Sequence, residues 1–395
     1  MFFIVAFFIA VFTFGVIPYS ANVNASDVKN EEQGALSLQP LITNLPSSWG
    51  LNVSPDNFLF VTHRSGTLAK YSLSGELLAT IDLQLDDLYY KGQGGLSAIA
   101  FHPDFASTPW IYLSYSYGSD SGNGLKVIRV LLSDKESASL SDKESASANN
   151  AFSVASKETI FEQADLRGTA AHYGARLAFM SDRSLLISTG DGSDYREYAQ
   201  KTSSDMGKIL RLTDTGGIPN NNPFAKAQSF SEKAIYSLGH RNPQGLIVMP
   251  SDQIIAHEHG PAGGDEINII KPGFNYGWPV ITQGKDYIGS LITPFTQYEG
   301  MQQPNVNWTP SIAPSGMVFY DADALPSFAN SLLITSLKFK QLHVLALNGE
   351  IIENEVIFFA DSQHRMRDIA VSNNGRVFIL SDGKLATIFE VVMTQ

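Results

Sequence analysis

A stretch of mixed chemistry lies near the middle of the chain, HEHGPAGGDEINIIKPGFNYGWP, from His257 to Pro279. Gly260 lets the backbone approach a ligand closely, and Pro261 has no N–H, so nearby carbonyl oxygens are free to bind a hard cation such as calcium. Glu266 can add a carboxylate and Tyr276 a backbone carbonyl to such a site. The alternative explanation of the Gly-Pro pair is an ordinary turn.

Two further stretches carry groups suited to proton transfer and charge stabilisation. His172 lies in GTAAHYGARLAF, and an imidazole that titrates near neutrality suits a general base. Arg241 and Asn242 lie in LGHRNPQGL, where the permanent charge of the guanidinium could stabilise a developing oxyanion. The alternatives are a hydrogen-bonded loop histidine and an arginine that bridges two loops.

Three cations stand out late in a sparsely basic chain: Lys338, Arg365 and Arg367. The two arginines are two residues apart, so in an extended strand they share a face. Two cations side by side repel each other unless an anion lies between them. Surface solvation is the usual explanation of such a pair, but a multiply charged anion is the better one if the pair lines a channel.

The elements that must position these groups are predicted to be β-strands. A coarse pattern recurs along the chain, a turn rich in Asp, Asn, Pro or Gly followed by a β-branched or aromatic run, which is typical of hairpins. A long-period repeat of strand groups predicts an all-β propeller with four-stranded antiparallel blades, and functional loops at the mouth of its channel. The segment LITNLPSSWGLNV is expected to add a strand to the last blade and close the ring. Six stretches show the pattern: SPDNFLFVTHRSGTLAKYSL, FHPDFASTPWIYLSYSY, FMSDRSLLISTGDGSD, VMPSDQIIAHEHG, FYDADALPSFANSLLITSL and VSNNGRVFILSDGKLATIFEV.

Composition excludes several classes of protein. The 395 residues are 44% hydrophobic and 17% charged, which indicates a globular chain. A formal charge of -12 argues against a nucleic-acid partner, which would require a basic surface. The absence of cysteine from the sequence rules out disulfides, zinc-thiolate sites and a thiol nucleophile.

The sequence is predicted to consist of an N-terminal signal peptide and one large domain. Residues 1–25 are an apolar run followed by small residues at Val23 and Ala25, which predicts a cleaved signal peptide and a periplasmic or secreted protein without stable membrane insertion. An uncleaved anchor is the alternative, because no basic residue precedes the run. Residues 26–395 are predicted to form a single propeller domain. Within it, residues 133–149 contain the tandem duplication SDKESASLSDKESAS, interpreted as a solvent loop without function.

Taken together, these stretches resemble the soluble pyrroloquinoline-quinone (PQQ) dependent sugar dehydrogenases, and the aldose sugar dehydrogenase branch more than the strict glucose enzymes. The resemblance runs in order over most of the chain after residue 25, which makes chance similarity a poor explanation. It implies a six-bladed propeller, in agreement with the six repeats. The motifs that carry it are GQGGLSAIAFHPDF, HYGARLAF, STGDG, MGKILRL, NNPF, YSLGHRNPQGL, HEHGPAGGDEINIIKPGFNYGWP and PSIAPSGMVFY.

The resemblance also implies roles in an oxidation of aldoses to lactones. His172 would be the general base that takes the proton of the anomeric hydroxyl, while the hydride passes to PQQ. Arg241 would polarise the quinone carbonyl and Asn242 would help to hold the cofactor. Gly260 and Pro261 would give carbonyl oxygens to a calcium ion (Ca2+) that also binds PQQ. Four further residues match positions that contact PQQ: Gln93, Lys338, Arg365 and Arg367.

Other implied features are less closely matched. Glu266 and Tyr276 match a second, structural calcium site, and Trp308 lies near a position whose ring can cover the active site. Ala171 stands where the glucose-specific branch has an acidic residue before the base, so the residue that orients His172 is open, with Asp191 as the candidate.

Three hypotheses for the function of the protein remain open at this point. The first is a PQQ- and calcium-dependent aldose dehydrogenase with an unidentified electron acceptor. The second is a calcium-dependent hydrolase of the lactonase type, and the third a non-catalytic carbohydrate-binding propeller. The resemblance is weakest between Gln283 and Asn307, where substrate loops are expected to differ.

Overall fold

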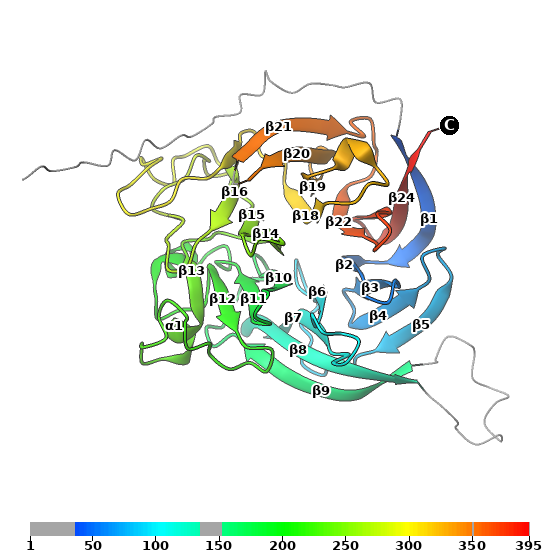
Figure 1. Cartoon of the computed structure of the whole chain (residues 1–395). Coiled ribbons are helices and arrows are strands. Elements are labelled where there is room, and N and C mark those ends of the chain that lie inside the picture. Colours follow the sequence, from blue (N-terminus) through cyan, green and yellow to red (C-terminus); the bar gives the residue numbers. More distant parts are fainter. Residues whose placement is uncertain (1–35, 135–151, 350, 395) are drawn as a thin grey trace, which may run out of the picture.

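The computed structural model describes residues 36–134, 152–349 and 351–394. In these residues the chain forms six four-stranded antiparallel sheets arranged around a common axis (Figure 1). The predicted fold, an all-β six-bladed propeller, is therefore confirmed. The predicted signal peptide, residues 1–25, lies outside the described residues, as does most of the predicted insert. Residues 135–151 separate β8 from β9, which pair with each other in one blade.

Each blade consists of strands that are consecutive in sequence, except the last. Blade 1 contains β2 (Ser48–Val53), β3 (Leu59–His63), β4 (Thr67–Tyr71) and β5 (Leu77–Asp82). Blade 2 contains β6 (Leu96–Phe101), β7 (Ile111–Ser119), β8 (Gly122–Asp134) and β9 (Phe152–Glu162). Blade 3 contains β10 (Gly174–Phe179), β11 (Leu185–Thr189), β12 (Lys208–Leu212) and β13 (Ile235–Leu238). Blade 4 contains β14 (Pro243–Val248), β15 (Ile254–Glu258), β16 (Asp265–Ile270) and β17 (Val306–Trp308). Blade 5 contains β18 (Pro314–Tyr320), β19 (Ser331–Ser336), β20 (Leu342–Asn348) and β21 (Ile351–Phe358). Blade 6 contains β22 (Met366–Val371), β23 (Val377–Ser381), β24 (Leu385–Met393) and β1 (Leu36–Pro46).

The ring is closed by pairing the first described strand with the last. β1 runs antiparallel to β24, with Leu38 opposite Val391 and Leu45 opposite Ala386. The blue and red strands lie side by side in Figure 1. The prediction that a segment before the first repeat completes the last blade is confirmed, although the closing strand begins earlier, at Leu36, and residues 48–53 of the same segment already form β2.

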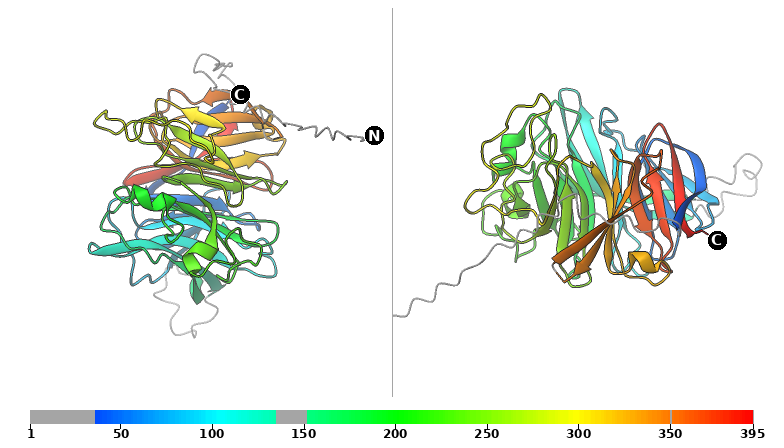
Figure 2. Two further views of the ribbon diagram at one scale, coloured as in Figure 1. Left: turned by 90° about the vertical axis from the view of Figure 1, so that its left-hand side faces the viewer. Right: turned by 90° about the horizontal axis from the view of Figure 1, so that it is seen from above.

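The six repeats of the sequence are the first hairpins of the six blades. In blade 1, Asn57 adopts a positive φ of 68° in the turn between β2 and β3. Arg183 and Asp252 do the same in the corresponding turns of blades 3 and 4, with φ of 68° and 63°. These turns lie at one face of the ring, because the strands run between its two faces (Figure 2). The opposite ends of the first two strands of every blade therefore meet at the other face.

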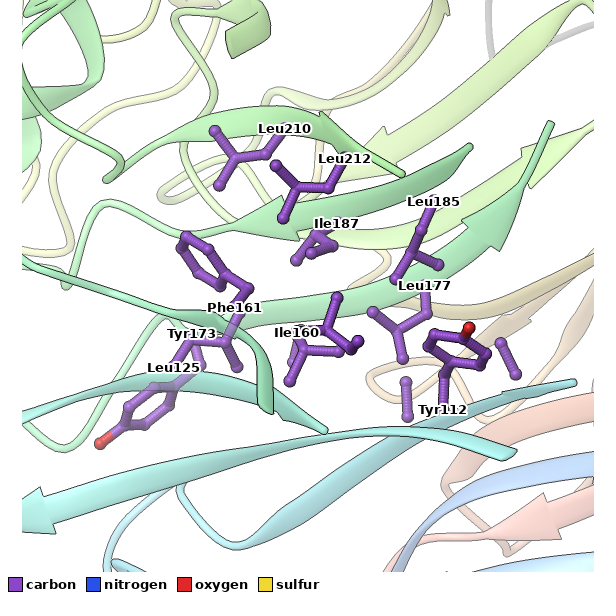
Figure 3. Close-up of a cluster of buried hydrophobic side chains, with 14 of the residues drawn as sticks. Tyr112, Leu125, Ile160, Phe161, Tyr173, Leu177, Leu185, Ile187, Leu210 and Leu212 are labelled. Carbon is purple, nitrogen blue, oxygen red and sulfur yellow. The ribbon is translucent and has the colours of Figure 1, made fainter. Parts of the chain in front are cut away.

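Apolar side chains fill the spaces between blades. In the cluster between blades 2 and 3, Tyr112 lies beside Leu177 at one end and Leu125 lies near Phe161 at the other, and all four are at most 9% exposed (Figure 3). Burying a large aliphatic or aromatic side chain contributes roughly 1.5–3 kcal/mol, so such clusters hold neighbouring blades rigidly together. This rigidity allows loops from separate blades to form one site.

Helices contribute little to the described residues. α1 (Phe230–Ala234) begins after Ser229, whose hydroxyl oxygen accepts a hydrogen bond from the Glu232 N–H, as expected of an N-cap. The short 3-10 helices are η3 (Arg196–Gln200) and η4 (Pro326–Phe328). Among the described residues, no helix combines the length and apolar character that a membrane span requires.

Arg176 of β10 ties the inner strands together. Its guanidinium donates to the Gln244 carbonyl of blade 4 at 2.6 Å and to the Ser315 carbonyl of blade 5 at 3.0 Å. It also pairs with Asp368 of blade 6 at 2.8 Å and lies 4.3 Å from the centre of the Trp49 ring of blade 1. One side chain thus contacts four other blades at the centre of the ring.

Candidate active site

The register of the blades brings the predicted site residues to one mouth of the ring. In blade 4, the start of β14 pairs with the end of β15, Pro243 opposite Glu258. Arg241 and Asn242 therefore lie at the same end as Gly260. Blades 3 and 6 repeat this arrangement, with Gly174 opposite Thr189 and Met366 opposite Ser381. Loops that are far apart in the sequence consequently meet around one cavity.

This cavity, called the main cavity because predicted cofactor-contacting residues line it, has a volume of about 350 Å³ and is not the largest cavity of the described residues. Four of the predicted cofactor-contacting residues line it: Gln93, Asn242, Arg365 and Arg367. Lys338 does not line it; its side chain is exposed, and the preceding Leu337 reaches the cavity instead.

His172 is held by Asp191. The Nδ1 atom of His172 lies 2.8 Å from an oxygen of Asp191, a carboxylate that is fully buried. The same carboxylate accepts hydrogen bonds from the indole N–H of Trp278 and the backbone N–H of Ser193, both at 2.8 Å. A carboxylate that accepts from Nδ1 leaves Nε2 as the nitrogen that can take a proton. The suggested partner of His172 is therefore in contact with it.

The backbone around His172 is equally constrained. His172 has φ of 51°, a left-handed conformation that costs free energy in a non-glycine residue. The side-chain oxygen of Gln93 accepts a hydrogen bond from the His172 N–H at 2.8 Å. A Cβ atom at Gly190 would lie 2.0 Å from the His172 carbonyl oxygen, so the glycine of the STGDG motif permits this close packing.

Arg241 is buried beside one of the two carbonyl oxygens that were predicted to bind calcium, that of Gly260. Its Nη1 donates to the carbonyl of His259 at 3.0 Å and to that of Gly260 at 2.7 Å. Its backbone N–H donates to Glu258, and its guanidinium lies 5.4 Å from the centre of the Trp278 ring. A carbonyl oxygen has a second lone pair, so Gly260 retains the capacity to bind a cation as well.

Glu266 lies in a carboxylate pair with Glu258, directly opposite it in the ladder of β15 and β16. Burial, with a further contribution from the charge of Glu258, raises the pKa of Glu266 to about 8. Tyr276 helps to line a small cavity of about 10 Å³ next to these carboxylates, which is room for one small ion or one water. Oxygen donors of this kind are those that calcium accepts. In the described part of the chain, no group of three or more His, Cys, Asp or Glu side chains is arranged to hold a metal, so any calcium here would depend partly on backbone carbonyls.

The arginine pair of blade 6 has an internal partner. Asp382 accepts from Arg365 at 3.0 Å and from Arg367 at 2.8 Å. Burial alone would raise the pKa of Asp382, but the two guanidinium groups hold it below its usual value. The expectation that this pair needs a bound anion between its members was therefore too strong, because the fold supplies one.

Several site residues were missed from the sequence, and one was misplaced. Arg64 lines the main cavity and follows β3, as Arg241 follows β13, so its position after a strand could have revealed it. Trp278 had no such signal. Trp308 is buried in β17 and donates to Glu355 at 3.1 Å, so the suggestion that its ring covers the site is wrong. The physical reason is its strand position, which directs the indole toward blade 5, where it belongs to the apolar cluster between blades 4 and 5.

A second cavity is lined in part by Arg241. It has a volume of about 370 Å³, and its walls include polar and aromatic groups from separate loops. Asp286 and Tyr287 belong to the segment between Gln283 and Asn307, where substrate loops were expected to differ. The lining residues are Ser193, Asp194, Arg196, Arg241, Pro261, Trp278, Asp286, Tyr287 and Ile292.

Comparisons with known proteins agree with this geometry. The chain is 36% identical to the aldose sugar dehydrogenase YliI of Escherichia coli K12 over 362 residues, which is 90% of this chain and 92% of that protein. The crystal structure of the soluble aldose sugar dehydrogenase of Escherichia coli in the apo-form matches with a TM-score of 0.82 and 34% identity, covering 91% of this chain and 100% of that chain. The PQQ-bound form of the aldose sugar dehydrogenase from Streptomyces coelicolor matches with a TM-score of 0.71 and 26% identity, covering 91% of this chain and 98% of that chain. The predicted family and the predicted enzyme class, an oxidoreductase, are confirmed. Residues 45–390 match the family model of the glucose/sorbosone dehydrogenases, and the chain belongs to that family.

Proposed function

We propose that this protein oxidises aldose sugars at the anomeric carbon to lactones, with PQQ and calcium bound at the main cavity. The observation that carries the proposal is the His172–Asp191 pair, placed at the same mouth of the ring as Arg241 and the cavity's cations. When bound, PQQ supplies the hydride acceptor, and the protein's part is to orient the reactants and tune their charges.

His172 acts as the general base. Because Asp191 accepts from Nδ1 at 2.8 Å, Nε2 is the atom that takes the proton of the anomeric hydroxyl. The buried carboxylate then stabilises the imidazolium that forms. Loss of this proton helps the anomeric carbon to release its hydride.

The main cavity fits a compact polyanion such as PQQ, which carries three carboxylates. Arg64, Arg365 and Arg367 line it, and the negative charge of Asp382 offsets only one of them. Asn242 and Gln93 add amide groups at its inner wall. Lys338 is exposed next to this wall and would have to turn inward to contact the cofactor.

Arg241 and the Gly260–Pro261 turn would form the positive side of the site. Arg241 would polarise the quinone carbonyl, whose carbon accepts the hydride while its oxygen gains negative charge, and the carbonyls of Gly260 and Pro261 would hold the catalytic calcium. Glu266 and the carbonyl of Tyr276 would hold the second calcium. The sugar would enter through the second cavity, where Asp194 and Tyr287 offer hydrogen bonds and an aromatic surface.

Export is part of the proposal. Residues 1–25 would direct the chain to the periplasm or the outside and would then be cleaved. Electrons would leave to a carrier whose identity the site does not specify.

A reconstitution assay tests the proposal. The chain from Ser26 onward is mixed with calcium and PQQ, and reduction of a dye is followed with a panel of aldoses. Reduction that requires both additions supports the proposal. Binding of PQQ without reduction of the dye by any aldose would overturn the substrate assignment, and failure to bind PQQ would overturn the whole proposal.

A further inference from the structure

Asp191 is a buried anion whose hydrogen bonds come from neutral groups and an imidazole. Its side chain is fully buried, and its donors are the Trp278 indole, the Ser193 N–H and His172. A carboxylate removed from water keeps its charge only if its surroundings compensate for lost hydration. Hydrogen bonds supply part of that compensation, and a nearby cation would supply the rest.

Arg167 is a buried cation without a matching ion pair in the described residues. It is 1% exposed, and Nη1 donates to the Gln163 side-chain oxygen at 2.7 Å. Its guanidinium carbon lies 4.3 Å from the centre of the Tyr173 ring. Its Nε and Nη2 atoms have no hydrogen-bond partner in the described part of the chain. A guanidinium of this kind must compensate a charge, since desolvation of an uncompensated ion is very costly.

The position of Arg167 beside the backbone that follows Asp191 favours Asp191 as that charge. A Cβ atom at Gly192 would lie 2.4 Å from Cδ of Arg167, so the side chain crosses the backbone immediately after Asp191. Thr169 binds the Gly192 carbonyl through its hydroxyl, and the backbone of Arg167 pairs with that of Asn123 in both directions at 2.9 Å. The loop before His172 and the loop after β11 are therefore packed together, with Arg167 between them.

We propose that Arg167 is a positioning residue whose buried charge compensates that of the Asp191 carboxylate, so that Asp191 fixes the Nδ1–H form of His172. The role in turnover rests on the proposed function, but the electrostatic coupling does not. Burial lowers the pKa of Arg167, and the opposing influences come from Tyr173, Asp191, Asp205 and Tyr195. Asp205 is thus the rival partner.

Other charged groups face this cluster and define the controls. From blade 3, Asp205 is 1% exposed and Lys208 is fully buried. Blade 4 contributes Arg241 and His259, and burial lowers the pKa of His259 to about 4, with a smaller contribution from His172. Tyr195 lies on the loop after β11 and binds the Gly168 N–H at 3.2 Å. Replacing Asp205 tests whether Asp205, rather than Asp191, is the partner of Arg167. This variant leaves Arg241 and His259 of blade 4 in place.

The test follows the ring signals of His172 by NMR as a function of pH, in protein without PQQ or substrate. Removal of a nearby cation favours the protonated imidazole, so Arg167→Met should raise the titration midpoint by about 1 pH unit. Arg167→Lys keeps the charge and should leave the midpoint within about 0.3 units. Asp205→Asn should also leave it nearly unchanged. An unchanged midpoint in Arg167→Met, or equal shifts in the Met and Lys variants, would overturn the proposal.

Two further results keep the proposal testable if a variant folds poorly. If Arg167→Met does not fold, the double variant Arg167→Met/Asp191→Asn should fold, because it removes both charges. Failure of the double variant to fold while Asp191→Asn alone folds would contradict the pairing. In active enzyme, the acidic limb of the kcat/KM profile should move to higher pH in Arg167→Met and not in Arg167→Lys. If the His172 midpoint shifts by NMR but the protein shows no dehydrogenase activity, the electrostatic coupling of Arg167 to the pair would be supported. Only the proposed function would then be contradicted.

Discussion

Replacement of Arg176 by methionine is predicted to destabilise the fold by about 4 kcal/mol. The change leaves Asp368, whose side chain is 4% exposed, as a buried carboxylate without its cation. Removing one member of a buried ion pair costs about 3–5 kcal/mol. The carbonyls of Gln244 and Ser315 also lose a charged donor, but such losses overlap with the first and do not add fully.

The assay is equilibrium unfolding in urea. The urea concentration at the midpoint of unfolding should fall, while the dependence of the free energy of unfolding on urea concentration should stay constant. The matched control is Arg176→Met/Asp368→Leu, which removes both charges and should recover more than half of the lost free energy of unfolding. A loss below about 1 kcal/mol in the single variant would refute the argument that Arg176 ties the blades. A double variant no more stable than the single one would also refute it.

Three more predictions concern the mouth of the ring. Because burial raises the pKa of Glu266 to about 8, above its usual value of 4.5, its ionisation opposes folding, so metal-free protein should lose stability as pH rises from about 4.5 to 8. Thermal unfolding in EDTA should show this fall of stability with rising pH. Both Glu266→Gln and added calcium should remove most of the fall. An identical pH dependence in the variant would exclude Glu266 as its source. Gly190→Ala places a Cβ atom 2.0 Å from the His172 carbonyl oxygen, so turnover should fall at least about tenfold, and wild-type turnover would show that the loops adapt freely. Replacing Arg365 and Arg367 together by alanine should weaken PQQ binding about tenfold or more by titration, since each charged hydrogen bond contributes roughly 1.5–3 kcal/mol, whereas unchanged affinity would remove the pair from the cofactor site.

Much of the fold was predictable because it depends on local patterns. Turn residues such as Asn57 mark the first hairpins, and the register then carries residues just outside each hairpin to one mouth. His172, Arg241 and Asn242 were selected as candidates by their positions next to strands, and the structure brings them to that mouth. Because a ring of blades must close, a strand from before the first repeat could be expected in the last blade, but its start at Leu36 could not be predicted.

The partners of these residues were harder to predict, because they come from other loops. Asp382 reaches Arg365 and Arg367 from the end of the neighbouring strand β23, and Trp278 reaches Asp191 from a loop far away in the sequence. The sequence pattern alone did not predict either contact. Trp308 shows the opposite failure, since an aromatic residue near a site motif turned out to belong to the apolar cluster between blades 4 and 5. Side-chain direction within a strand decides such cases, and it is fixed only by the register.

The most direct test of the central claim compares the wild-type chain with His172→Ala, each supplied with PQQ and calcium. Both proteins should bind PQQ with equal affinity, because the imidazole is proposed to act on the sugar. Dye reduction with the best aldose should be about 100-fold slower or more in the variant, as expected for loss of a general base. Turnover of the variant within a few-fold of the wild-type rate would contradict the proposed mechanism.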